Sequence, residues 1–169
     1  RTGPAALVAV AALLLGVAVV FAQPSRGSKA PALEIRDTAG KAFSLKEELK
    51  KGPVFVSFWG SWCAPCRDEF PLVSRMAKSW QPKGVAFVSV AVWDKDAQVR
   101  SFIRKNKPAQ RVAVDVNKKV FTAWDLDAVP ANFLIGRDGK VLAFYDQFET
   151  SDIPAIEKDL KQALKAYGK

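Results

Sequence analysis

The stretch VFVSFWGSWCAPCRDEFP, residues 54–71, decides the fold of this chain. It opens with a continuous apolar run from Val54 to Trp59, which is typical of a strand buried on both faces of a parallel sheet. Two cysteines follow at positions 63 and 66, and apolar residues then recur at helical spacing from Phe70 onward. The stretch therefore predicts a strand, a loop and a helix, with Cys63 and Cys66 presented where the loop meets the helix.

The chain on either side of this unit alternates strand and helix signals. Further strands are expected at residues 33–36, 85–92, 112–116 and, as a hairpin, 132–135 and 141–145. Helices are expected after the candidate caps Ser44, Asp94 and Ser151 and near residues 120–124, the last helix carrying apolar residues from Ile153 to Tyr167. Alternating strands and helices that end in a hairpin and a helix predict a three-layer α/β sandwich.

Composition excludes several classes of function. The 169 residues contain no histidine, which rules out Ser/His/Asp and Cys/His catalysis and metal sites that need imidazole. Two cysteines alone cannot build a four-ligand zinc cage, so we expect no metal and no cofactor. The net charge of +9 favours acidic partners or an anionic membrane surface. The basic residues are scattered over predicted helix faces, so we expect no nucleic-acid partner.

An apolar segment, AALVAVAALLLGVAVVFA, runs from Ala5 to Ala22 without a charged residue. It is long enough to cross a membrane as a helix and predicts a signal anchor within residues 1–22. The alternative is a signal peptide cleaved before Gln23, because Val20 and Ala22 fit a small-residue cleavage pattern. Residues 23–31 read as a Pro/Gly/Ser linker and residues 32–169 as the folded domain. Either alternative carries that domain across the membrane, where disulfide chemistry is favoured.

The spacing Cys-Ala-Pro-Cys at the start of a helix suits thiol-disulfide exchange, which needs one thiolate to attack and a second thiol to resolve the mixed disulfide. Free backbone N–H groups at the helix start favour the thiolate of Cys63, while Cys66 lies one turn further in. Trp62 would form an apolar wall beside Cys63. The alternatives are a structural disulfide or two ordinary buried thiols, and a purely stabilising bridge is poorly motivated because so short a loop constrains the unfolded chain little.

The segment FWGSWCAPCRDEFP, Phe58 to Pro71, resembles the active-site segment of the thioredoxin-like superfamily, and most closely its TlpA/ResA/DsbE branch. A second segment, AVPANFLIGRDGKVL from Ala128 to Leu142, resembles the cis-proline loop and hairpin of that superfamily. The likeness covers about residues 31–165. It implies a thioredoxin-like fold with a mixed sheet, anchored in the bacterial cytoplasmic membrane with its domain on the periplasmic or extracytoplasmic side. It also implies protein disulfides as substrates and a membrane electron donor that regenerates the dithiol.

Carried over by position, the resemblance makes Cys63 the attacking thiol and Cys66 the resolving thiol. Pro130 would be the cis-proline, and Val129 would offer backbone hydrogen bonds to an extended substrate. The alternative is a trans proline in an ordinary loop. The threonine that usually follows the cis-proline is replaced by Ala131, which concerns substrate preference.

Glu69 matches an acidic residue that serves proton transfer in the ResA-like reductases, so the resemblance adds it to the catalytic residues. The alternative is a glutamate on the surface. Thioredoxin itself has a buried aspartate in the strand before the cysteines, and Ser57 stands at that position here. Proton transfer therefore falls to Glu69.

The direction of reaction is inferred from the two residues between the cysteines. The proline of the reductants is present at Pro65, and the histidine of the strong oxidant is absent, so we expect a reductase. A dithiol oxidase is the alternative. A peroxiredoxin would need Pro and Thr or Ser where this chain has Val56 and Gly60, and a Sco-type copper chaperone would need a histidine.

Overall fold

The computed structural model describes residues 23–166 and centres on a five-stranded mixed sheet of order β5-β4-β3-β6-β7. Its central strand is the predicted run Val54–Trp59, which is β3 and is buried at every position. The others are β4 (Ala86–Ala91), β5 (Arg111–Val114), β6 (Ala131–Ile135) and β7 (Val141–Tyr145). The β3, β4 and β5 strands are parallel, whereas β6 is antiparallel to both β3 and β7.

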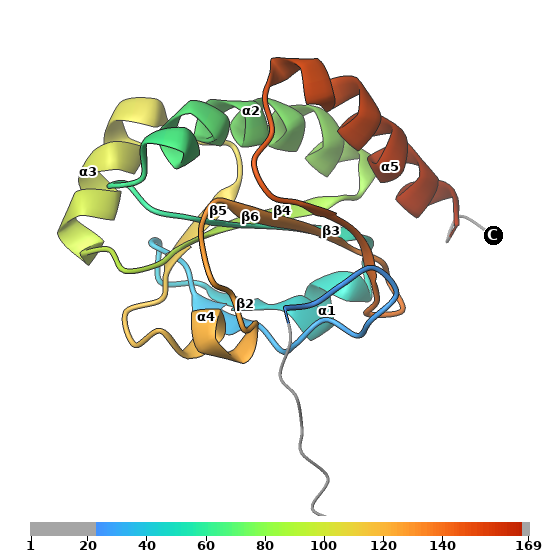
Figure 1. Ribbon diagram of the computed structural model, residues 1–169, viewed down its shortest axis with the longest axis horizontal. Helices are drawn as coiled ribbons and strands as arrows, with labels where there is room; N and C mark the ends of the chain where they lie inside the picture. The colour runs from blue at the N-terminus through green and yellow to red at the C-terminus, as the bar shows by residue number, and fades with distance from the viewer. Residues whose placement is uncertain (1–22, 167–169) are drawn as a thin grey trace, which may run out of the picture.

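Helices cover both faces of this sheet, as the predicted three-layer sandwich requires (Figure 1). One face carries α2 (Ala64–Trp80), α3 (Asp96–Asn106) and α5 (Ile153–Lys165). The other carries α1 (Leu45–Leu49), α4 (Lys119–Ala123) and the hairpin of β1 (Glu34–Arg36) and β2 (Ala42–Ser44). Two short 3-10 helices, η1 (Gln81–Lys83) and η2 (Thr150–Asp152), precede β4 and α5.

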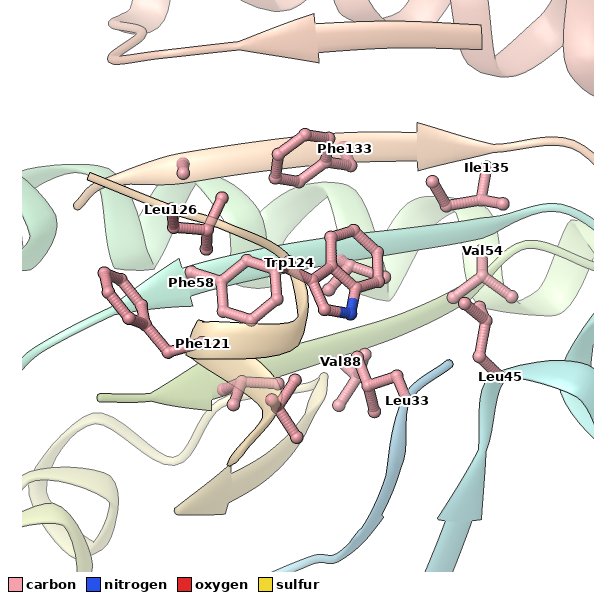
Figure 2. Packing of buried hydrophobic residues seen from close by; sticks show 14 of the residues in the cluster. Leu33, Leu45, Val54, Phe58, Val88, Phe121, Trp124, Leu126, Phe133 and Ile135 are labelled. Atoms are coloured by element: carbon pink, nitrogen blue, oxygen red, sulfur yellow. The ribbon is translucent and has the colours of Figure 1, made fainter. Parts of the chain in front are cut away.

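The β3 strand divides the core into two layers because its side chains alternate between the faces of the sheet. Val54 and Phe58 join the cluster under α4, where the Phe58 ring lies 5.1 Å from that of Trp124 (Figure 2). Phe55 and Trp59 point toward the layer that contains α2. Burying a side chain as large as phenylalanine contributes about 1.5–3 kcal/mol, so both layers hold β3 in place ahead of the cysteines.

Two of the three candidate helix caps are wrong. Ser44 caps α1 as predicted, since its Oγ accepts from the Glu47 N–H. The residue before α3 is Lys95, and Asp94 instead accepts a hydrogen bond from the Ser61 N–H at 2.6 Å. Ser151 lies inside η2, whose capping box is made by Glu149 and Asp152. The Asp94 carboxylate therefore binds a backbone N–H from a distant loop and does not cap α3, which the residues around Asp94 do not indicate.

The amino-terminal part of the described chain runs along the sheet. The Gly27 N–H donates to the Val141 carbonyl at 2.8 Å, and Lys29 forms a β-bridge with Lys140. The predicted apolar segment 5–22 and Tyr167 lie outside the described residues. Within residues 23–166, no helix has the length and apolar character needed to cross a membrane.

Candidate active site

A disulfide joins Cys63 and Cys66 at the start of α2. Cys63 is the N-cap, and its sulfur accepts a hydrogen bond from the Cys66 N–H at 3.2 Å. Pro65 occupies the first turn, where its missing N–H costs nothing. Cys63 keeps 6% of its surface exposed against 1% for Cys66. The helix start thus gives the more accessible sulfur a donor that stabilises a thiolate once the disulfide is reduced.

The loop before β6 faces this sulfur. The peptide bond between Val129 and Pro130 is cis, so the alternative of a trans proline is wrong. The carbonyl oxygen of Val129 lies 3.8 Å from the Sγ of Cys63. Within residues 23–166, the Val129 N–H donates no hydrogen bond. The residue whose carbonyl faces the Cys63 sulfur therefore keeps an unused backbone donor.

Glu69 lies in the interior, one helical turn after Cys66, with 3% of its surface exposed. The alternative of a surface glutamate is therefore wrong. Its Oε1 accepts from Asn132 Nδ2 at 2.7 Å, and its Oε2 accepts from the Phe148 N–H at 3.0 Å. Burial raises the pKa of Glu69 to about 7, against the two donors, which lower it, and with the nearby charge of Asp146, which raises it.

Asn132 is the residue of this site that sequence reasoning missed. It lies on β6, is fully buried, and stands directly opposite Ser57 of β3. Its Nδ2 also approaches the carbonyl oxygens of Tyr145 and Asp146 at 3.4 and 3.3 Å, while its Oδ1 has no partner among the described residues. The buried polar groups of this site are therefore Asn132 on β6 and Glu69 on α2. The β3 strand contributes no aspartate, because Ser57 stands there. A polar residue inside the apolar run ANFLI was the available signal.

Trp62 is the predicted apolar wall beside Cys63, and half of its surface is exposed to solvent. Its side chain is 50% exposed, and its indole Nε1 donates to the Val92 carbonyl at 3.1 Å. Gly60 makes room for this ring, because a Cβ at that position would lie 2.5 Å from the indole nitrogen. The residue preceding Cys63 is thus fixed in place while it faces solvent.

No group of three or more His, Cys, Asp or Glu within residues 23–166 is placed to hold a metal ion. The chemistry that the described side chains offer here is exchange at two sulfurs, with a carboxyl group nearby that can take up or release a proton near neutral pH.

Comparison with known proteins places this arrangement in a family. Residues 26–144 match the model of the AhpC/TSA family. The chain belongs to the AhpC/TSA family. This family member is 37% identical over 118 residues to the thiol-disulfide oxidoreductase ResA of Bacillus subtilis, a match that covers 70% of this chain and 65% of ResA. It is 30% identical over 140 residues to ResA of Geobacillus thermodenitrificans, covering 83% of this chain and 76% of that protein.

Solved structures give the same answer for the fold. A structure assigned to a thiol:disulfide interchange protein DsbE from Chlorobium tepidum superposes with a TM-score of 0.77 at 30% identity, covering 84% of this chain and 99% of that one. The thioredoxin-like α/β fold implied by the sequence resemblance is therefore confirmed. The chain spans just under two thirds of the length of the Bacillus subtilis relative.

Proposed function

We propose that this AhpC/TSA-family protein is a thiol-disulfide oxidoreductase that reduces disulfide bonds in other proteins. The observation that carries the proposal is the Cys63–Cys66 disulfide at the start of α2, with the Cys63 sulfur beside the open backbone of Val129. The relatives named ResA and DsbE support the same reaction class.

Cys63 and Cys66 are sufficient for one round of reduction of a substrate disulfide. In the reduced protein, the Cys63 thiolate attacks one sulfur of the substrate disulfide, forming a mixed disulfide and releasing the first substrate thiolate. The Cys66 thiolate then attacks the Cys63 sulfur, which closes the disulfide seen in the structure and releases the second substrate thiolate. The substrate gains two electrons and, once its thiolates are protonated, two protons. A dithiol donor in the membrane must return the electrons to the Cys63–Cys66 pair.

Glu69 serves the second step in this proposal. The buried thiol of Cys66 must lose a proton before it can attack, and Glu69 follows it by one turn on the same face of α2. A carboxyl group whose pKa is about 7 is present in both protonation states near neutral pH, which suits a group that accepts and returns a proton.

The site of action follows from the amino-terminal segment. We place the catalytic domain, residues 32–169, outside the cytosol together with residues 23–31, which pair with its sheet, and residues 5–22 as its anchor in the bacterial cytoplasmic membrane. Cleavage before Gln23 would give a soluble secreted protein instead. Fractionation of cells that express the full chain, with amino-terminal sequencing of the product, distinguishes the two.

The reduction potential of the full chain, equilibrated against glutathione or dithiothreitol in detergent, tests the direction of the reaction. A reductase should lie near or below about −220 mV, because a more oxidising pair would take electrons from substrate thiols. A value near about −120 mV would replace the reductase with a dithiol oxidase.

A further inference from the structure

We propose that Trp62 and Trp93 form an aromatic ledge that binds an apolar side chain of the substrate protein, close to the disulfide that Cys63 attacks. The inference rests on the proposed function and adds to it a substrate-recognition site. Trp93 lies after β4, and neither sequence patterns nor the resemblance singled it out.

Exposed apolar side chains gather at this point of the surface. Trp62 is 50% and Trp93 43% exposed, and their ring centroids are 5.9 Å apart. Val116 is exposed as well and lines, together with Trp93, an open hollow of about 450 Å³. A soluble domain rarely leaves several large apolar side chains together in water unless they bind something.

The ledge is held rigid before any substrate arrives. The Trp62 indole is tied to the Val92 carbonyl, and the Trp93 ring packs against Phe121 at 4.5 Å between centroids. Asp94 joins the two loops by accepting from the Ser61 N–H. Preorganised aromatic rings lose little conformational entropy on binding, which is a property of interface hot spots.

The backbone of Trp93 supports a role for its side chain. Its φ of 51° lies in the left-handed region, which a bulky residue seldom adopts and a glycine would enter without strain. A strained residue that exposes its ring against Trp62, the residue before Cys63, is the pattern expected of a functional contact.

The charged side chains around the ledge balance one another. Lys95 and Lys118 line the hollow beside Trp93 and make no ion pair within residues 23–166. The carboxylate of Asp94 is engaged by backbone N–H groups, and that of Asp115 accepts from the Phe121 N–H. Two lysines and two aspartates therefore leave the hollow without net charge, so the ledge fits an uncharged apolar side chain better than a charged one.

Continuity with the active site sets where that residue lies. Trp62 directly precedes Cys63, and an extended peptide advances about 3.3 Å per residue. The centroid separation of 5.9 Å between the two rings therefore places the bound side chain about two residues beyond the substrate position that faces Trp62.

The test compares two peptides of equal length, each closed by one disulfide. One has Leu at the positions two residues before and two residues after the attacked cysteine, the other has Ser at both positions, and the two peptides are otherwise identical. The reduced full chain should prefer the first by about tenfold or more in kcat/KM, and Trp93→Ala should bring this preference close to one. Trp93→Phe keeps a ring against Phe121 and should retain part of the preference.

Phe144→Ala is the matched control, because Phe144 is also an exposed aromatic residue, 38% accessible, but lies on the edge strand β7. It should keep the wild-type preference, and thermal unfolding of each variant checks that it is folded. An unchanged preference in Trp93→Ala would overturn the ledge while leaving the proposed reaction intact. If the wild-type chain reduced neither peptide, the proposed function itself would be wrong, and the ledge with it.

Discussion

The two sides of the Cys63–Cys66 disulfide are built in opposite ways. Toward the interior lie a carboxyl group and an amide, Glu69 and Asn132, both buried and hydrogen-bonded to each other. Toward solvent lie two indole rings, Trp62 and Trp93, each about half exposed. Globular domains ordinarily bury their apolar groups and leave carboxylates in water, so this inversion on both sides of one reactive bond is informative.

Each side serves a different need of disulfide exchange. A carboxyl group in water would hold its pKa near that of a free glutamate and would be ionised at neutral pH, whereas burial keeps Glu69 close to half-protonated at pH 7. A substrate, in contrast, must find an accessible apolar surface, which only exposed rings provide. The buried carboxyl group therefore stabilises the fold less at neutral pH than at low pH, whereas the exposed rings are open to contact with a substrate.

Removing the sulfurs should have the largest effect, because both sides act through them. Cys63→Ser should lower turnover by about a thousandfold or more, and Cys66→Ser should accumulate a mixed disulfide between Cys63 and the substrate. Mass mapping after brief iodoacetamide treatment of the reduced wild-type protein should find the label on Cys63, the more exposed of the two. Predominant labelling of Cys66 would reverse their roles.

Glu69→Gln tests the inner side through the pH dependence of stability. The folded protein raises the pKa of Glu69 from 4.5 to about 7, so it holds that proton more tightly than the unfolded chain. The resulting stabilisation is fully present below pH 4.5 and is lost as pH rises through 7. Urea unfolding of the oxidised wild-type protein should show a loss of about 2–3 kcal/mol between pH 5 and pH 8 from this group.

That slope should be absent in Glu69→Gln and retained in Asp68→Asn, which changes an exposed carboxylate next to it on α2. A wild-type protein as stable at pH 8 as at pH 5 relative to Glu69→Gln would show that the carboxyl group titrates normally. Turnover against pH, measured on the same two variants, reports whether the proton of Glu69 also enters the reaction.

Asn132→Ala should have an intermediate effect on the same side. Losing the Nδ2 donor removes a contact that lowers the pKa of Glu69, so the pH midpoint of the stability loss should move upward. At pH 8 the ionised carboxylate would lack this donor, at a cost of about 1–3 kcal/mol. Asn106→Ala, at an exposed asparagine of α3, should leave the midpoint where it is. An unchanged pH midpoint in Asn132→Ala would mean that the Asn132 amide does not affect the pKa of Glu69.

Gly60→Ala should give the smallest effect and concerns the outer side. Its Cβ would lie 2.5 Å from the Trp62 indole nitrogen, so the ring must move and its bond to the Val92 carbonyl is lost. We expect a stability loss of about 1 kcal/mol and a shift in tryptophan fluorescence, with iodoacetamide still labelling Cys63. Ser61→Ala keeps the same backbone and should show neither change. An unaltered fluorescence spectrum in Gly60→Ala would contradict the tight placement of Trp62.

Sequence patterns predicted the layers of the fold well and the cysteine pair fully, because both depend on neighbours along the chain. They failed at Asp94 and Ser151, where local cap signals competed with contacts made elsewhere. They left Glu69 undecided, because a glutamate on a helix has the same local pattern whether it is buried or exposed. Nothing along the chain marked Trp93.

What the sequence by itself determined is local: the apolar run Val54–Trp59, the helix that follows it, and the one-turn spacing of Cys63 and Cys66. Each depends on residues within a few positions, where backbone geometry alone fixes which side chains are neighbours. Only the tertiary structure brought Glu69 to Asn132 across 63 positions and placed Trp93 beside Trp62. Burial, and with it the pKa of a carboxyl group, is a property of what packs around a residue, and that is settled only when the sheet and helices have come together.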